Sequence, residues 1–312
     1  MPAKYRVLVT STSFNKVDPL PRERLIQFGC EIVENPFGRP LKEEELIPLL
    51  KDIDGIVAGL DEYSRKAILS TNRLKVISRY GVGVDNIDLE AAKERGILVV
   101  NTPEVNTQAV ADLTFGLILA VCRKIPKAHF STQKGNWGRL IGRGVYKKSL
   151  GIIGLGRIGK AVAERARGFS MEILAYDIKI ERAPGETLGI RYVPLDELLA
   201  EGDFITLHCD LNPGSKGIIG AEELSLMKKT AYLINTARGG LIDENALFEA
   251  LRAGKIAGAA LDAFQDEPPV NSPLLTLDNI ITTPHIGSYT HEALLEMGLI
   301  AVDNLIHNLD KE

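Results

Sequence analysis

Cysteine is scarce in this sequence of 312 residues, since Cys30, Cys122 and Cys209 are the only three. They are widely spaced and form no Cys-x-x-Cys pair, so neither a disulfide framework nor a zinc knuckle is indicated. We expect three reduced thiols in a cytoplasmic protein. The sequence also has no His-Glu-x-x-His pattern or other cluster of ligand residues, so no metal site is expected.

Long hydrophobic runs and an excess of positive charge are also missing. No apolar run approaches the roughly 18 residues of a membrane-spanning helix, and the short stretch 109–122 is interrupted by Asp112, which favours a buried helix. The start, MPAKYRVLVTST, does not resemble a signal peptide. The net charge of −4 gives no polycationic surface, so neither nucleic acid nor a membrane is expected as a partner.

Short β-branched runs alternate along the chain with longer stretches of helical periodicity. The expected strands are 6–10, 55–58, 75–78, 97–100, 149–153, 171–176, 203–208, 231–235, 258–261 and 279–282. The expected helices are 104–123, 157–169, 195–201, 244–253 and 291–308. Apolar runs that alternate with helices predict an α/β protein with parallel sheets built from βαβ units.

A glycine-rich turn follows the expected strand 149–153. Gly154, Gly156 and Gly159 form the pattern G-x-G-x-x-G, the segment after them has helical periodicity, and Asp177 lies 18 residues beyond Gly159. In this context the pattern predicts a dinucleotide-binding turn, in which the glycines allow a tight turn and close approach of a pyrophosphate. Asp177 would accept hydrogen bonds from a ribose diol and repel a 2′-phosphate, so NAD is expected over NADP. The alternative is a glycine-rich turn with an incidental aspartate.

The motif begins in the middle of the chain, so the first hundred residues should form a separate α/β unit. A helix opened by Asn101-Thr102-Pro103-Glu104 would carry the chain across, and the last helix could return to the first unit. We expect residues 1–101 and 286–312 to form a discontinuous substrate-binding domain and residues 102–285 to form the Rossmann domain. The segment 128–146 looks irregular and is either an interface arm or a surface loop.

Polar side chains follow several strands, at the edge where ligands of parallel sheets bind. Arg238, Glu267 and His285 each follow a different expected strand, and His208 lies at the end of a fourth. Carbonyl reduction by a nicotinamide needs a cation for the substrate carboxylate, a proton donor near neutral pH and an anion that keeps this donor protonated. Position alone does not separate His208 from His285, and Arg238 and Glu267 could also be ordinary surface residues.

Several motifs occur in an order that resembles one family. They are RYGVGVDNID at 79–88, NTPEVN at 101–106, the Gly154 turn, LSLMK at 224–228, NTARGG at 235–240, Asp262 with EPP at 267–269, and PHIG at 284–287. Together they resemble the D-isomer-specific 2-hydroxyacid dehydrogenases, and within them the phosphoglycerate dehydrogenase-like branch. The resemblance implies a Rossmann domain inserted into a smaller flavodoxin-like domain, a homodimer, and NAD-dependent reduction of a small 2-keto acid.

The resemblance also implies roles for individual residues. Arg238 would bind the substrate carboxylate and carbonyl, His285 would donate the proton and Glu267 would pair with it, which favours His285 over His208. Backbone N–H groups at Gly81, Val82 and Gly83 would hold the substrate carboxylate. The implied cofactor contacts beside the three glycines are Arg157, Ile158, Asp177, Cys209, Thr236, Ala237, Asp262 and Gly287.

Departures from the family pattern bear on the substrate. Ala58 stands where phosphoglycerate enzymes carry a phosphate-binding arginine, which puts phosphoglycerate in doubt. Arg79 matches a basic position of the branch and either binds a second polar group of the substrate or has a packing role. The chain stops at Glu312, so no carboxy-terminal regulatory domain is expected. Two alternatives remain, an NAD-sensing protein of the corepressor type and, with less support, a Rossmann methyltransferase.

Overall fold

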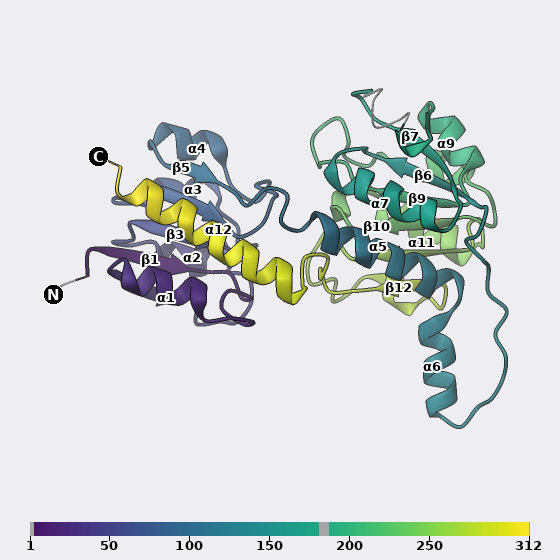
Figure 1. Ribbon diagram of the computed structural model, residues 1–312, viewed down its shortest axis with the longest axis horizontal. Coiled ribbons are helices and arrows are strands. Elements are labelled where there is room, and N and C mark those ends of the chain that lie inside the picture. Colours follow the sequence, from purple (N-terminus) through teal and green to yellow (C-terminus); the bar gives the residue numbers. More distant parts are fainter. Residues whose placement is uncertain (1–2, 181–186, 312) are drawn as a thin grey trace. The chain divides into compact units, whose positions relative to one another are not determined.

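A computed structural model describes residues 3–180 and 187–311. The chain divides into two compact units, one formed by residues 1–106 and 288–312 and the other by residues 107–287. The boundaries predicted from the sequence lie after residues 101 and 285, whereas the observed boundaries lie after residues 106 and 287. Each unit is an α/β structure with its own sheet, and each is described by itself below (Figure 1).

The first unit contains a five-stranded parallel sheet with the order β2-β1-β3-β4-β5. Its strands are β1 (Tyr5–Val9), β2 (Cys30–Glu34), β3 (Gly55–Ala58), β4 (Val76–Arg79) and β5 (Leu98–Val100). Its helices are α1 (Leu20–Gln27), α2 (Glu43–Leu49), α3 (Arg65–Leu69), α4 (Leu89–Glu94) and α12 (His291–Leu309). This strand order is that of flavodoxin-like folds, as the resemblance implies.

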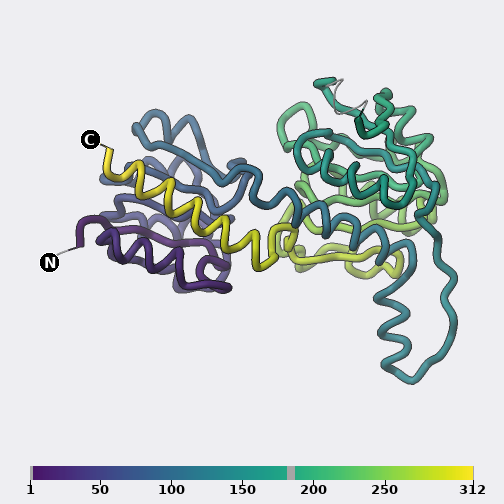
Figure 2. Tube along the Cα trace, viewed as in Figure 1, coloured from purple at the N-terminus to yellow at the C-terminus, as the bar shows by residue number. Residues whose placement is uncertain are grey.

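Helices cover both faces of this sheet because successive strand residues point to opposite sides. Leu8, Ile56 and Ile77 pack in one buried cluster, towards α2, α3 and α4. Val7 and Val57 pack on the other side with the apolar face of α12, whose buried residues recur at helical spacing. The last helix therefore lies beside the first strands of the chain, as the yellow and purple segments of Figure 2 show.

The second unit contains a seven-stranded parallel sheet with the order β12-β11-β10-β9-β6-β7-β8. Its strands are β6 (Ser149–Ile153), β7 (Glu172–Tyr176), β8 (Ile190–Tyr192), β9 (Phe204–Leu207), β10 (Tyr232–Asn235), β11 (Gly258–Leu261) and β12 (Ile280–Thr282). Its helices are α5 (Thr107–Cys122), α6 (Ile125–Gln133), α7 (Arg157–Gly168), α9 (Leu195–Glu201), α10 (Ala221–Leu226) and α11 (Glu244–Arg252). The order reverses between β6 and β9, as in a Rossmann fold, which confirms the predicted fold class.

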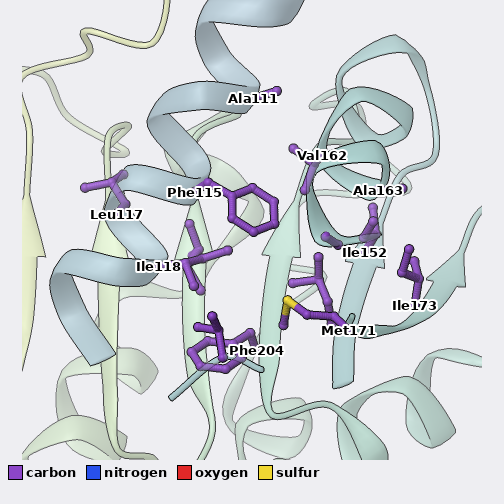
Figure 3. Packing of buried hydrophobic residues seen from close by; sticks show 14 of the residues in the cluster. Ala111, Phe115, Leu117, Ile118, Ile152, Val162, Ala163, Met171, Ile173 and Phe204 are labelled. Carbon is purple, nitrogen blue, oxygen red and sulfur yellow. The ribbon is translucent and has the colours of Figure 1, made fainter. Parts of the chain in front are cut away.

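Helices α5 and α7 bury one face of the second sheet. Phe115 and Ile118 of α5 and Val162 of α7 pack with Ile152 and Phe204 of the central strands (Figure 3). The rings of Phe115 and Phe169 stack with their centroids 5.4 Å apart, next to the C-terminal end of α7. This packing holds α7, whose first residue follows the glycine-rich turn, against the sheet.

Three expectations about elements require correction. Helix α5 begins at Thr107 and not at Glu104, because Glu104 has a positive φ of 74° that no helix accommodates. Helix α6 covers residues 125–133 and therefore includes the first part, 128–133, of the segment expected to be irregular; it extends away from the rest of its unit (Figure 1). Strands β2 and β8, which the sequence pattern did not predict, complete the outer edges of the two sheets. Among the described residues, no helix is long and apolar enough to cross a bilayer.

Candidate functional site

The glycine-rich turn after β6 has the geometry that a dinucleotide requires. Gly154 has a φ of +93°, and a Cβ there would lie 2.5 Å from the backbone nitrogen of Cys209. A Cβ on Gly159 would lie 2.3 Å from the carbonyl oxygen of Gly154, so only glycine allows α7 to start so close to the strand. A Cβ on Gly156 would meet nothing within 4 Å. The backbone of Gly156, at the N-terminus of α7, is therefore open to a phosphate group.

Asp177 stands directly after β7 and braces this turn. Its Oδ2 accepts a hydrogen bond of 2.6 Å from the N–H of Leu155, and its Oδ1 accepts one of 2.8 Å from the N–H of Lys179. The carboxylate is half-buried and keeps acceptor capacity for a ribose diol. Arg157 is exposed at the start of α7, and Ile158 packs against the core beneath it.

The hydroxyl of Thr236, after β10, has a defined direction. Thr114 donates its proton to the carbonyl oxygen of Val110 at 2.8 Å, so the contact of 2.9 Å between the Thr114 and Thr236 hydroxyls has Thr236 as donor. Towards a ligand, Thr236 can then act only as an acceptor. Ala237 is half-buried beside it, and its N–H donates to Oδ1 of Asn235.

Arg238 is held by the strand end and by an unusually close contact between backbones. Its carbonyl oxygen accepts a hydrogen bond from Nδ2 of Asn235, and its Nη1 donates to the carbonyl of Ala237. A Cβ on Gly239 would lie 1.9 Å from the carbonyl carbon of Phe264, so the segment after β11 packs directly on the turn after β10. That segment carries Glu267, and the positive charge of Arg238 contributes to lowering the pKa of its carboxyl group.

Glu267 and His285 form an ion pair at the ends of β11 and β12. The Nδ1 of His285 lies 3.0 and 2.9 Å from the two carboxylate oxygens of Glu267. The side chain of His285 is 26% exposed and that of Glu267 is 33% exposed, so one side of the pair faces solvent. Burial raises the pKa of Glu267, but the hydrogen bond and charge of His285, the N–H of Phe264 and Arg238 together hold it below its ordinary value. Glu267 is therefore ionised at neutral pH and accepts from His285.

His208, the other candidate proton donor, has a different environment. Its Nε2 lies 2.9 Å from the hydroxyl of Thr206, and its buried Nδ1 has no partner among the described residues. Burial lowers the pKa of His208 to about 3, so the ring is neutral near pH 7. Its neighbour Cys209 is half-buried, and burial raises the pKa of its thiol to about 11, which keeps the thiol protonated.

Asp262, the first residue after β11, lies under the segment that carries His285. Its carboxylate accepts hydrogen bonds from the hydroxyl of Thr283 and from the N–H groups of Ile286 and Gly287. Burial raises the pKa of Asp262, against the effect of these hydrogen bonds and of the charge of His285. Thr283 was not among the site residues predicted from the sequence, although it lies only two residues before His285.

In the first unit, the loop after β4 has its carbonyl groups tied back into the protein. The carbonyl of Gly81 accepts from the N–H of Thr102, that of Val82 from Nδ2 of Asn101, and that of Gly83 from Nε of Arg79. The N–H of Gly81 donates to the hydroxyl of Thr102. By contrast, the N–H groups of Val82 and Gly83 have no acceptor among the described residues. Asn101 and Thr102, expected to open a helix, instead shape this loop.

Arg79 lies beneath the same loop and is only 5% exposed. Its guanidinium donates to the carbonyl groups of Ala58, Tyr80 and Gly83. A Cβ on Gly81, where φ is +143°, would lie 2.9 Å from Nη1 of Arg79, so the loop folds closely over the guanidinium. The side chain of Ala58 is fully buried in the cluster with Ile56 and Ile77 and presents no group to a ligand.

The model of the D-isomer specific 2-hydroxyacid dehydrogenase NAD binding domain matches residues 115–287. The chain is 48% identical over 292 residues to a D-3-phosphoglycerate dehydrogenase of Methanocaldococcus jannaschii, covering 92% of this chain and 56% of that protein. It is 44% identical over 289 residues to a glyoxylate reductase of Thermococcus litoralis, covering 89% and 87% of the two chains. The solved structure of a D-lactate dehydrogenase from Aquifex aeolicus with NAD and lactic acid is 33% identical, has a TM-score of 0.83 and covers 96% of this chain and 93% of that one.

The chain thus spans little more than half the length of the phosphoglycerate dehydrogenase and most of the glyoxylate reductase. These relatives are dehydrogenases and reductases, which favours the dehydrogenase interpretation over an NAD-sensing protein. The domain model covers the Gly154 turn and the pair formed by Glu267 and His285. The resemblance inferred from the motifs is confirmed: the chain belongs to the D-isomer specific 2-hydroxyacid dehydrogenase family, and residues 115–287 form its NAD-binding domain.

Proposed function

We propose that the protein reduces a small 2-keto acid to a 2-hydroxy acid with NADH, with His285 as the proton donor. The ion pair between His285 and Glu267 is the observation that carries this proposal. NADH, when bound, would supply the hydride for the keto carbon, and His285 would donate its proton to the keto oxygen, so that the product is the hydroxy acid. The residues of the Gly154 turn, with Asp177 and Thr236, would hold the cofactor.

The ion pair determines which ring nitrogen acts on the substrate. An ionised carboxylate only accepts hydrogen bonds, so Nδ1 of His285 carries a proton that it donates to Glu267. The transferable proton is therefore on Nε2. His208 has no carboxylate partner among the described residues and is neutral near pH 7, so it does not fit the donor role.

Arg238 is proposed to bind the substrate carboxylate and polarise the keto oxygen. Its guanidinium stays charged at any working pH and can donate two parallel hydrogen bonds to a carboxylate. The hydrogen bonds of the backbone to Asn235 and the close packing of Gly239 place its side chain at the end of β10. Positive charge next to the keto oxygen stabilises the negative charge that develops as the hydride arrives.

The N–H groups of Val82 and Gly83 are proposed to bind the substrate carboxylate. Because every carbonyl from Tyr80 to Gly83 is engaged by an internal donor, the loop turns its acceptors inward and leaves these two donors. Arg79 supports the loop from beneath, and a direct contact between Arg79 and a polar substituent of the substrate remains the competing proposal. Replacement of Arg79 by alanine should raise the KM for the best keto acid, and an unchanged KM would exclude both roles.

Hydroxypyruvate and glyoxylate are proposed as better substrates than phosphohydroxypyruvate. The buried Ala58 contributes no cation, and the guanidinium of Arg79 already donates to three carbonyl groups. The loop therefore offers little positive charge to the phosphate group of phosphohydroxypyruvate. The test is oxidation of NADH at 340 nm with hydroxypyruvate, glyoxylate, pyruvate, phosphohydroxypyruvate and sulfopyruvate, with NADPH in parallel.

Turnover of one of these keto acids with NADH would support the proposal. Preference for NADPH would contradict the role of Asp177. Tight binding of NADH without turnover of any keto acid would instead favour a sensing protein. Highest kcat/KM with phosphohydroxypyruvate would contradict the argument from Ala58.

A homodimer is proposed from the exposed apolar side chains of one segment. Helix α6 has no buried residue, and it and the chain that follows expose Phe130, Trp137, Ile141 and Tyr146, with Trp137 82% and Ile141 89% exposed. Such a set is unusual on a monomer surface, and a second copy of the same segment would cover it. Light scattering should give twice the chain mass of 34.1 kDa. Replacement of Trp137 and Ile141 by aspartate should give the monomer, whereas aspartate at the exposed Ile26 should not.

A cytoplasmic location is proposed from the state of the cysteines. Cys30 and Cys122 are buried and all three thiols are free. Reduced thiols of this kind are usual in a reducing compartment. Fractionation of cells that express the protein tests this, and recovery from a secreted or membrane fraction would contradict it.

A further inference from the structure

The family resemblance implies that Asp262 contacts the cofactor, but its carboxylate also contacts the segment that carries His285. The residue is only 1% exposed and follows β11 directly. Its own N–H donates to the carbonyl of Asn235 at 2.8 Å, which fixes its backbone to the neighbouring strand. Its carboxylate is thus held in a constant place relative to the sheet.

Among the residues that the structure describes, the carboxylate accepts three hydrogen bonds, and all three come from residues around His285. Oδ1 accepts from the hydroxyl of Thr283 at 2.6 Å and from the N–H of Ile286 at 2.8 Å, and Oδ2 accepts from the N–H of Gly287 at 2.8 Å. An ionised carboxylate has about four acceptor positions, so most of its capacity is used by this one segment. The donors lie on both sides of His285 in the sequence.

His285 itself has a backbone conformation that needs support. Its φ is +54°, in the left-handed region that residues other than glycine rarely adopt. Its N–H donates to the carbonyl of Thr283, so residues 283–285 form a tight turn that ends at the residue that carries the imidazole. The carboxylate of Asp262 joins the first residue of this turn to the two residues after it.

We propose that Asp262 is a positioning residue that holds the turn at His285, so that the imidazole meets Glu267 and presents Nε2 to the substrate. This inference rests on the proposed function of His285. In the variant Asp262→Asn, an amide NH₂ replaces one acceptor and faces either Thr283 and Ile286 or Gly287. The turn then loses at least one hydrogen bond and relaxes, while the cofactor turn at Gly154 is unchanged.

The experiment compares Asp262→Asn with Asp243→Asn, a matched control in which the aspartate also accepts from two backbone N–H groups, at the start of α11. For Asp262→Asn we expect kcat with saturating NADH to fall by about tenfold to a hundredfold, while the Kd for NADH changes by less than about threefold. Asp243→Asn should affect thermal stability and leave kcat unchanged. A weaker Kd for NADH with an unchanged kcat would overturn the proposal in favour of a cofactor contact.

Thr283 provides a second test if Asp262→Asn does not fold. Thr283→Val removes only the hydroxyl donor to Asp262 and should lower kcat, whereas Thr283→Ser keeps the donor and should restore it. Equal kcat values for valine and serine would overturn the proposal.

A readout without substrate separates this inference from the proposed function. The NMR resonance of the Nδ1 proton of His285, identified by its loss in His285→Asn, should shift or broaden in Asp262→Asn and stay in place in Asp243→Asn. An unchanged resonance would overturn the positioning role even in an active enzyme. Failure of the wild-type protein to reduce any keto acid would instead reject the proposed function, whatever the resonance shows.

Discussion

The Nδ1 atom of His285 lies 3.0 and 2.9 Å from the two carboxylate oxygens of Glu267, at the ends of neighbouring parallel strands. The pair joins an imidazole N–H to a carboxylate whose pKa lies below its ordinary value, so the carboxylate is ionised and fixes Nδ1 as the donor. Its two members are 18 residues apart in the sequence and meet because β11 and β12 end at the same edge of the sheet.

Replacement of Glu267 by glutamine should slow the reduction of the keto acid. The amide keeps the size of the side chain but no longer offers Nδ1 of His285 two acceptor oxygens, so the orientation of the imidazole is less well fixed. We expect kcat to fall by about 10²-fold, while the Kd for NADH stays unchanged. A kcat equal to that of the wild type would contradict the pairing.

Replacement of Arg238 by glutamine should affect catalysis and leave cofactor binding intact. Loss of the cation next to the developing negative charge should lower kcat by about 10²–10³-fold and raise the KM for the keto acid. The Kd for NADH, measured by fluorescence titration, should stay within about threefold of the wild type. A large loss of NADH affinity would place Arg238 in the cofactor site.

Replacement of Gly154 by alanine should weaken binding of NADH. A Cβ at this position of positive φ would lie 2.5 Å from the backbone nitrogen of Cys209, so the turn must move. We expect the Kd for NADH to rise by about tenfold or more, which is about 1.4 kcal/mol. Gly168, at the end of α7, is the matched control, because a Cβ there meets nothing within 4 Å. Equal Kd values for the two alanine variants would contradict the role of the turn.

His208 should make folding stability depend on pH in the acid range. Burial lowers the pKa of His208 from 6.5 to about 3, so the folded protein keeps the ring neutral while the unfolded chain takes up a proton below pH 6.5. Its contribution to stability is therefore complete above pH 6.5 and is lost as the pH falls towards 3. From pH 7 to pH 5, urea denaturation should show the wild type losing about 2 kcal/mol more than His208→Asn. Parallel pH dependence of the two proteins would contradict this.

The regular part of the fold was predictable because parallel strands that are buried on both faces consist of continuous apolar runs. Strands β3, β6 and β11 were predicted with the same bounds that the structure has. By contrast, β2 and β8 form sheet edges, where one side of the strand is not paired and polar residues such as Glu31 and Arg191 are tolerated. Their alternation is weak, and the sequence pattern did not distinguish them from loops.

The candidate site was predictable to the extent that it follows strand ends. Motif order placed Arg238, Glu267 and His285 after three consecutive strands, and the structure brings the last two into contact. The motif order did not reveal that the side chains of Asn101 and Thr102 form hydrogen bonds with the loop at Gly81, because their partners are backbone groups 19 to 21 residues away. The motif order also could not reveal the left-handed conformation of His285, which lies between residues that are hydrogen-bonded to Asp262.

The most direct test of the proposed mechanism is the rate of NADH oxidation in a single turnover, with the best keto acid, for the wild type and for His285→Asn. The asparagine variant lacks a transferable proton but keeps the cofactor turn. The mechanism predicts an unchanged Kd for NADH and a rate that is lower by about 10²–10⁴-fold. A variant that oxidises NADH at the wild-type rate would show that another group donates the proton, and the role proposed here for His285 would be wrong.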